Sequence, residues 1–342
     1  MEQKRREDPC GRKEDAYIRE RKGTGGRYRR GRKRRVTERA YAKINLSLDV
    51  TGKRENGYHD VEMVMQAVGL YDKVTVEWEP MAGRAAQSRV AADPVPEQIV
   101  EAVSNLPYLP VNENNIACKA ARLMIRIYKP GESLRIKINM EKHIPVGAGL
   151  AGGSADGAAV LRALSRLWHL NLNLSELCSL GEQLGADVPF CLWAQEGLTC
   201  ALGRGLGEEL SSLPPLDSWV LMVKPPFSVS TAKVYAALDM EALAPESRPD
   251  TENVMAGLAG ADVKMLAASM KNVLETVTLV QFPRAAKLKA DMLQIGGADA
   301  VLMSGSGPTI FGLYRDEKAA RRAYAILRAQ YRETYLRRTC LE

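Results

Sequence analysis

Hydrophobic and polar residues alternate over residues 41–50 (YAKINLSLDV), in the manner of a β-strand. This period of two places Lys43 and Asn45 together on one face, opposite the aliphatic side chains. The Asn56-Gly57 dipeptide follows within a polar segment and is typical of a tight turn. The sequence therefore predicts a β-hairpin near the start of the folded part of the chain.

The remaining pattern predicts a mixture of strands and helices. Alternating or short aliphatic runs predict strands over 73–78, 134–141 and 219–224, in AVLMSG and TIFGLY, and in YLRRT. Stripes of helical period predict helices in NENNIACKAARLMIRIY, ADGAAVLRALSRLW and LSELCSLGEQLG, over 230–238 and 263–293, and in DEKAARRAYAILRAQY. Ser175 is the expected cap of the third helix, and residues 80–112, rich in Pro and Ala, are expected to form an irregular insertion. Helices mixed with antiparallel strand pairs predict an α+β protein.

The length of 342 residues suits two domains. We expect a basic tail over 1–35, an N-terminal domain over 36–195 and a C-terminal domain over 196–342 that resembles a split βαβ sandwich. The tail carries 15 of the 48 Lys and Arg but only 6 of the 41 Asp and Glu, so the rest of the chain is nearly neutral. This composition favours a disordered extension over an arm for nucleic acid or an anchor for an anionic surface.

Composition narrows the class of protein further. No stretch reaches the roughly 18 apolar residues of a membrane span, and the N-terminus lacks the apolar segment of a secretory signal. The six cysteines have no metal-type spacing, as in reduced cytoplasmic proteins. With only three histidines, far apart in sequence, a histidine-rich metal site is not expected. We therefore expect a cytoplasmic protein that works away from membranes.

A glycine-rich segment, PVGAGLAGGSADGAA (145–159), separates a predicted strand from a predicted helix. Its G-x-G-x-x-G spelling matches the dinucleotide fingerprint, but no aliphatic strand ending in an acidic residue follows the helix. A P-loop is also excluded, because Ser154 follows the glycines where that motif requires a lysine. Glycines at the start of a helix still allow close approach of an anion to free N–H groups. The segment therefore favours phosphate binding over a plain strand-to-helix turn.

The glycine segment resembles the second motif of the galactokinase, homoserine kinase, mevalonate kinase and phosphomevalonate kinase (GHMP) superfamily. Three more segments are similar to one family within it, the kinases of 4-diphosphocytidyl-2-C-methyl-D-erythritol in the non-mevalonate isoprenoid route. These segments are AYAKINLSLDVTGKRENGYHDVEMVMQ, LGADVPFCL and MSGSGPTIFGLY. The resemblance covers residues 36–342 and implies the two-domain GHMP fold, with an N-terminal S5-like domain and a C-terminal ferredoxin-like domain.

The resemblance implies ATP-dependent phosphorylation of the substrate's 2-hydroxyl, with Asp187 as general base, Lys43 as catalytic lysine and Mg²⁺ beside ATP. The 304–308 turn (SGSGP) would close the cleft. Asn45, Tyr58, His59 and Tyr235 would bind the cytidine and erythritol portions, the two tyrosines enclosing the pyrimidine. The residues expected around the ATP phosphates, with Ser154 and the amides of Gly149, Gly152 and Gly153 as donors, are Pro145, Val146, Gly147, Ala148, Gly149, Leu150, Ala151, Gly152, Gly153, Ser154 and Ala155.

Some residues depart from the family pattern. Ala148 and Ala151 replace glycines, and we expect the loop to keep its shape because a methyl group fits where φ is negative. Gly152 and Gly153 stand where many members have serines, so no metal ligand is assigned.

The alternative functions are a superfamily kinase that acts on mevalonate or homoserine, or a binding protein without chemistry. Apart from the small-molecule substrate, we expect a monomer or weak homodimer and no nucleic-acid partner.

Overall fold

The computed structural model describes residues 34–81, 96–339 and 341. The strands are β1 (Arg34–Lys53), β2 (His59–Pro80), β3 (Gln98–Ser104), β4 (Leu134–Glu141), β5 (Cys200–Arg204), β6 (Glu209–Ser212), β7 (Trp219–Lys224), β8 (Ala300–Met303), β9 (Ile310–Tyr314) and β10 (Glu333–Arg338). The helices are α1 (Ile116–Tyr128), α2 (Gly152–Leu167), α3 (Leu174–Glu182), α4 (Val188–Gln195), α5 (Thr231–Ala236), a 3-10 turn (Pro245–Ser247), α6 (Thr251–Ala259), α7 (Val263–Ser269), α8 (Glu275–Gln281), α9 (Pro283–Ile295) and α10 (Glu317–Arg328). Residues 1–33 of the predicted basic tail lie outside the described residues, and Arg34 and Arg35 begin β1.

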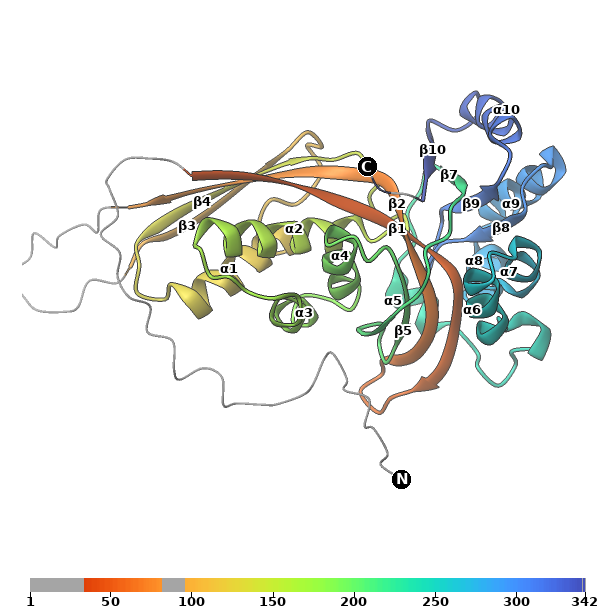
Figure 1. Cartoon of the computed structure of the whole chain (residues 1–342), viewed down its shortest axis with the longest axis horizontal. Helices are drawn as coiled ribbons and strands as arrows, with labels where there is room; N and C mark the ends of the chain where they lie inside the picture. The colour runs from red at the N-terminus through yellow and green to blue at the C-terminus, as the bar shows by residue number, and fades with distance from the viewer. Residues whose placement is uncertain (1–33, 82–95, 340, 342) are drawn as a thin grey trace, which may run out of the picture.

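The first sheet is built around the long antiparallel hairpin of β1 and β2. Its strands run in the order β3-β4-β2-β5-β6, with β1 also paired to β2. The register pairs Lys53 with His59 across a turn in which Gly57 has a φ of +84°. The predicted Asn56-Gly57 hairpin is therefore confirmed. Helices α1 to α4 cover one face of this sheet, and β1 and β2 bend towards the second half of the molecule (Figure 1).

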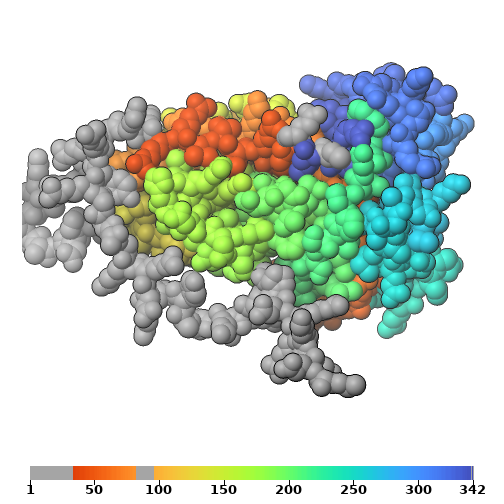
Figure 2. All heavy atoms as spheres, viewed as in Figure 1, coloured from red at the N-terminus to blue at the C-terminus, as the bar shows by residue number. Residues whose placement is uncertain are grey.

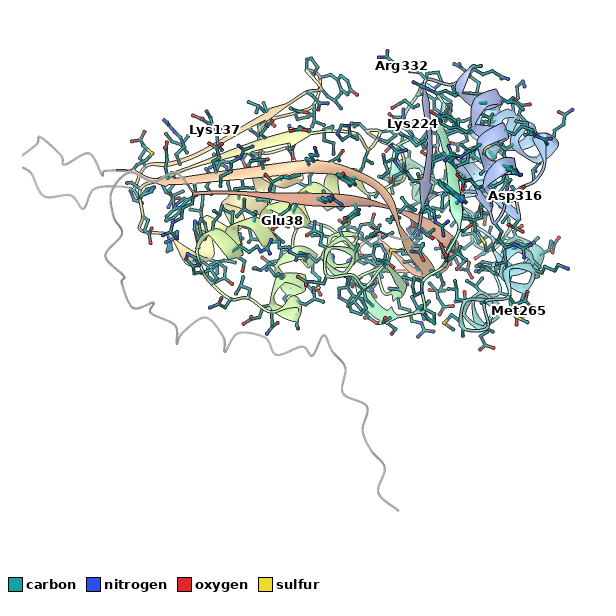
Figure 3. The ribbon with its side chains drawn as sticks, turned by 45° about the horizontal axis from the view of Figure 1, so that its top comes forward. Glu38, Lys137, Lys224, Met265, Asp316 and Arg332 are labelled. Carbon is teal, nitrogen blue, oxygen red and sulfur yellow. The ribbon has the colours of Figure 1, made fainter. Side chains whose placement is uncertain are left out.

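Alternation along β4 shows how this sheet divides its two faces. Its apolar residues are buried while Lys137 and the other polar residues beside it are exposed or half-buried. Figure 3 shows Lys137 on the open face and Glu38 of β1 on the side of the helices. There Arg166 of α2 donates a hydrogen bond to the Glu38 carboxylate at 2.7 Å. The polar and apolar period thus fixes which face receives the helices.

The second sheet has the order β10-β7-β9-β8, with every neighbouring pair antiparallel. Along the chain, helices α5 to α9 separate β7 from β8, and α10 separates β9 from β10. This is the order of a split βαβ, or ferredoxin-like, domain. The predicted α+β class and the predicted character of the second half are both confirmed.

Three local predictions were wrong. The expected irregular insertion over 80–112 contains β3, which pairs in parallel with β4. The expected helix over 263–293 is divided into α7, α8 and α9, because the chain extends at 270–272 to meet β1 and because Pro283 begins a new helix. Ser175 lies inside α3, whose cap is Asn173 in a capping box with Glu176.

The two halves of the molecule pack against each other through buried apolar side chains. One cluster combines Ile44, Val64 and Val68 of the first sheet with Met222 and Phe311 of the second. Figure 2 shows the blue and cyan C-terminal half in continuous contact with the rest. Strands β5 and β6 follow residue 195 yet belong to the first sheet, and the division at 195/196 stays a prediction. No helix in the described ranges is long and apolar enough to cross a membrane.

Candidate active site

Lys43, Asn45 and Asp187 come together where β1 meets the start of α4. The ammonium of Lys43 donates to the Asn45 side-chain oxygen at 2.6 Å and lies 3.7 Å from an Asp187 carboxylate oxygen. The Lys43 side chain is only 5% exposed, whereas that of Asp187 is 31% exposed. A buried ammonium thus sits beside a carboxylate that ligands can reach from solvent.

The polar face of β1 is buried rather than open to water. Asn45 and Ser47 are fully buried, and the pairing with β2 shifts register between them through a β-bulge or similar irregularity. Such an irregularity re-aims side chains locally. The Lys43 backbone N–H donates to the Leu150 carbonyl at 3.2 Å. This bond places the glycine loop directly beside Lys43.

Asp187 stands at the N-cap position of α4, yet its side chain makes no capping hydrogen bond. Pro189 lies in the first turn, where a missing N–H is tolerated. The cap position therefore fixes the Asp187 backbone while its carboxylate remains directed to Lys43. A purely capping role for Asp187, the structural alternative to a chemical one, does not describe this geometry.

The glycine loop ends at the N-terminus of α2, whose first residue is Gly152. The first-turn N–H groups of a helix have no acceptor within the helix, and Ala151 offers no side-chain cap. Gly147 and Gly149 have φ values of +61° and +74°. Ala151 also has a positive φ, +57°, so the expectation of a negative φ there was wrong. Its methyl group is accommodated in the left-handed region at a cost of about 1–2 kcal/mol.

The turn at 304–308 reaches the glycine loop from the second half of the molecule, as expected. The Ser304 hydroxyl donates to the Gly149 carbonyl at 2.9 Å. The Ser306 hydroxyl bonds the Thr231 hydroxyl at 2.8 Å, which ties the turn to α5. On the loop's other side, the Ser228 hydroxyl donates to the Val146 carbonyl at 3.4 Å. Both halves of the protein therefore shape the loop.

His59 and Tyr235 lie together, with ring centroids 5.5 Å apart. Burial lowers the pKa of His59, and the positive charge of Lys53 lowers it further. Burial raises the pKa of Tyr235, with the Asp187 charge adding to the effect. Tyr58 stands at the hairpin tip and is 62% exposed. Among the described residues it makes no ring contact with Tyr235, so the enclosure of a pyrimidine by these two rings stays a prediction.

Sequence reasoning missed a second set of charged residues, behind the glycine loop. The Lys142 ammonium bonds the carboxylates of Asp72 and Asp156, and all three are buried. The available signal was the single acid of the small-residue helix ADGAAVL, but its partners lie far away in sequence. In the described ranges, no three His, Cys, Asp or Glu side chains gather to hold a metal ion.

Comparison with known proteins follows the same division into two halves. Residues 115–195 match the GHMP kinases N terminal domain, and residues 254–333 match the GHMP kinases C terminal domain. A 4-diphosphocytidyl-2-C-methyl-D-erythritol kinase from Lachnospira eligens is 43% identical, over 82% of this chain and 89% of that protein. The one from Acetivibrio thermocellus is 42% identical, over 89% of this chain and 99% of that protein.

Solved structures show the same architecture. A crystal structure of 4-(cytidine 5'-diphospho)-2C-methyl-D-erythritol kinase superposes with a TM-score of 0.69 at 32% identity, over 89% of this chain and 98% of the other. A homoserine kinase from Cytophaga hutchinsonii superposes with a TM-score of 0.67 at 20% identity, over 91% of this chain and 97% of the other. At 20% identity, the similarity to the homoserine kinase shows a shared fold.

Proposed function

The chain belongs to the family of 4-diphosphocytidyl-2-C-methyl-D-erythritol kinases within the GHMP kinases, and from this premise we propose the reaction it catalyses. It transfers the γ-phosphoryl group of ATP to the 2-hydroxyl of 4-diphosphocytidyl-2-C-methyl-D-erythritol, giving the 2-phosphate and ADP. The observation that carries the proposal is the Lys43–Asp187 pair, 3.7 Å apart, beside a glycine loop. A non-catalytic binding protein would have no need of this pair.

Asp187 is the proposed general base and Lys43 its electrostatic partner. Phosphoryl transfer needs an acceptor oxygen that is held in line and relieved of its proton as the bond forms. The half-exposed Asp187 carboxylate can accept that proton, and the ammonium of Lys43 stabilises the resulting negative charge on the acceptor oxygen. Asn45 keeps the ammonium in place through its 2.6 Å hydrogen bond.

The loop from Pro145 to Ala155 is the proposed site of the ATP phosphates. The free amides at the start of α2 and the partial positive charge of the helix N-terminus favour an anion there. Gly149, Gly152, Gly153 and Ser154 are the proposed donors. Since the described residues include no cluster of three metal-ligating side chains, Mg²⁺ would be held mainly by ATP oxygens and water, as is common for this ion.

Asn45, Tyr58, His59 and Tyr235 are proposed to hold the acceptor. A lowered pKa keeps His59 neutral near pH 7, so its ring offers one donor and one acceptor to a pyrimidine edge. The raised pKa of Tyr235 keeps its hydroxyl protonated. Tyr58 and Tyr235 would then contact the faces of the pyrimidine. A small acyclic acceptor such as mevalonate or homoserine would use none of these ring contacts.

We place this reaction in the cytoplasm. Its partners would be small molecules, since no part of the proposed reaction calls for a membrane or a nucleic acid. The proposed oligomeric state is a monomer or weak homodimer. The basic segment before β1 has no role in the reaction.

The deciding experiment compares ATP consumption with three acceptors: the cytidylated methylerythritol, mevalonate and homoserine. Turnover only with the first is the expected result. Asp187→Asn should then lower kcat by about 100-fold or more, as for the loss of a general base, while the Kd for ADP stays within about threefold. Unchanged turnover in this variant would remove Asp187 from the proposed role, and preference for mevalonate or homoserine would overturn the acceptor.

A further inference from the structure

Lys142 sits between two buried carboxylates directly behind the glycine loop. Its ammonium bonds an Asp156 oxygen at 2.5 Å and also bonds an oxygen of Asp72. The side chains of the three residues are 3%, 3% and 0% exposed, in the order Lys142, Asp156, Asp72. We call these three residues the loop clamp.

The loop clamp joins the two ends of the glycine loop, the proposed phosphate site (here called the phosphate loop). The second oxygen of Asp72 accepts the N–H groups of His143 and Ile144, at 2.5 and 2.8 Å, immediately before the loop begins at Pro145. Asp156 comes immediately after Ala155, where the loop ends in α2. A side chain added at Gly152 would lie 3.6 Å from the Lys142 ammonium. The clamp therefore fixes the separation of the loop ends from the side facing the core.

The clamp also has one negative charge in excess when both carboxylates are ionised. Removing charges from water is costly, so a second buried acid needs a compensating partner. One oxygen of Asp156 has no hydrogen-bond partner among the described residues. Burial raises the pKa of Asp156 to about 7, with Asp72 adding to the rise and Lys142 opposing it. Protonated Asp156 leaves the clamp neutral.

Few other groups face this clamp from the surrounding elements. From α4, the buried Cys191 thiol is the titratable group that feels the Asp156 charge, and it also feels Asp187 and Lys43. From β10, Tyr335 feels the charge of Asp72. Neither is expected to change its proton near pH 7, because burial raises the pKa of each above its ordinary value. Asp156 is therefore the buried group of the clamp whose pKa lies near neutral pH, whereas the side chain of His143, the residue after Lys142, is exposed.

We propose that Asp72, Lys142 and Asp156 are positioning residues that hold the phosphate loop in its nucleotide-binding form, and that Asp156 takes a proton from solvent as the phosphates bind. The inference rests on the proposed kinase function, because it treats the loop as the nucleotide site. An approaching polyphosphate favours removal of the excess negative charge behind the loop, and protonation of Asp156 removes it. The O–H bond of Asp156 forms as hydronium or a buffer acid gives up its proton, and no other covalent bond changes in this step.

Calorimetric titration with ADP, in two buffers of different ionisation enthalpy at pH 7.5, measures the proposed proton uptake directly. The wild type should take up a fraction of a proton more than Asp156→Asn, which keeps a hydrogen-bond acceptor for Lys142 but cannot be protonated. The protons of ADP itself contribute equally to both and cancel in the difference. Above pH 7, the Kd for ADP should rise by up to about tenfold per pH unit in the wild type relative to Asp156→Asn.

A second variant tests the positioning role. Asp156→Ala opens the clamp and should raise the Kd for ADP by about tenfold or more, whereas Asp156→Asn should restore it to within about threefold of the wild type. Leu327→Ala, in the buried face of α10, is the control for lost stability alone and should leave the Kd for ADP unchanged. Equal proton uptake by wild type and Asp156→Asn, or wild-type affinity in Asp156→Ala, would overturn the inference. A wild-type protein that does not bind ADP would overturn the proposed kinase function with it.

Discussion

Gly149 of the glycine loop lies directly against the 304–308 turn of the second half of the molecule. Its φ is +74°, and a side chain there would overlap the Ser304 carbonyl and lie 3.2 Å from the Gly307 nitrogen. Both obstacles are backbone atoms, which cannot move aside as the end of a flexible side chain does. Gly153, in the first turn of α2, meets only Ile116 at 3.5 Å and has no positive φ. Two glycines of one loop therefore have different reasons to be there.

The contrast predicts opposite effects of the same substitution. Gly149→Ala should lower the free energy of unfolding by about 2–4 kcal/mol, because the left-handed backbone is strained and the methyl group overlaps the 304–308 turn. Gly153→Ala, in a helical conformation where the methyl group makes only an ordinary van der Waals contact with Ile116, should change it by less than about 1 kcal/mol, in the stabilising direction. Denaturant unfolding of both variants provides the measurement. A loss at Gly153 as large as at Gly149 would contradict this assignment.

At the scale of elements, the hydrophobic pattern predicted best those strands that their own residues and flanking turns specify. The expected strands over 134–141 and 219–224 match β4 and β7 because a period of two and flanking turns specify them. The helix expected over 263–293 failed because the Leu48 N–H and carbonyl bond the chain at Lys271 and Val273. These two segments are far apart in the sequence, and their pairing does not alter the hydrophobic periodicity of either one. The strand β3 was missed for a similar reason, because it is defined by its pairing with β4 and not by a pattern of its own.

Substitutions in helix α3 test whether Asn173, rather than Ser175, caps its N-terminus. Asn173 accepts the Glu176 N–H at 2.9 Å and the Glu176 carboxylate accepts the Asn173 N–H at 2.8 Å. Asn173→Ala should therefore cost about 1 kcal/mol of stability. Ser175→Ala, at an exposed position one residue inside the helix, should stay within about 0.5 kcal/mol. Thermal and denaturant unfolding would measure both, and a larger loss at Ser175 would restore that residue as the effective cap.

The candidate site was predictable to the extent that its residues lie in contiguous motifs. Lys43, Asp187 and the glycine loop could be named from short segments that resemble a family, and the structure brings them together. The loop clamp could not be found in this way. Asp72 and Lys142 are 70 residues apart, and only the packing of β2 against the end of β4 makes them partners. A buried charge is recognised by its surroundings, which the sequence does not display.

At the scale of the whole molecule, Asn272 connects the two halves around the site. Its backbone forms a parallel bridge with Leu48 of β1. Its side-chain amide donates to the carbonyls of Met303 and Gly305, at 2.9 and 2.8 Å, and its oxygen accepts the Leu274 N–H at 3.0 Å. The 304–308 turn, which contacts the loop through Ser304, is therefore held relative to the strand that carries Lys43. This buried amide thus contributes, beside the apolar cluster, to the contact between the halves.

Asn272→Ala should consequently destabilise the protein by about 2–4 kcal/mol, since it removes a buried amide that donates to two carbonyls and accepts one N–H. Asn253→Ala is the matched control: the side-chain amide of this exposed residue donates to the neighbouring Asp250, and its loss should cost less than about 1 kcal/mol. Urea unfolding measures both. Similar small losses in the two variants would show that the apolar contact between the halves, rather than Asn272, holds the turn in place. A large loss confined to Asn272→Ala is the result expected if the hydrogen bonds of this buried amide stabilise the contact between the halves.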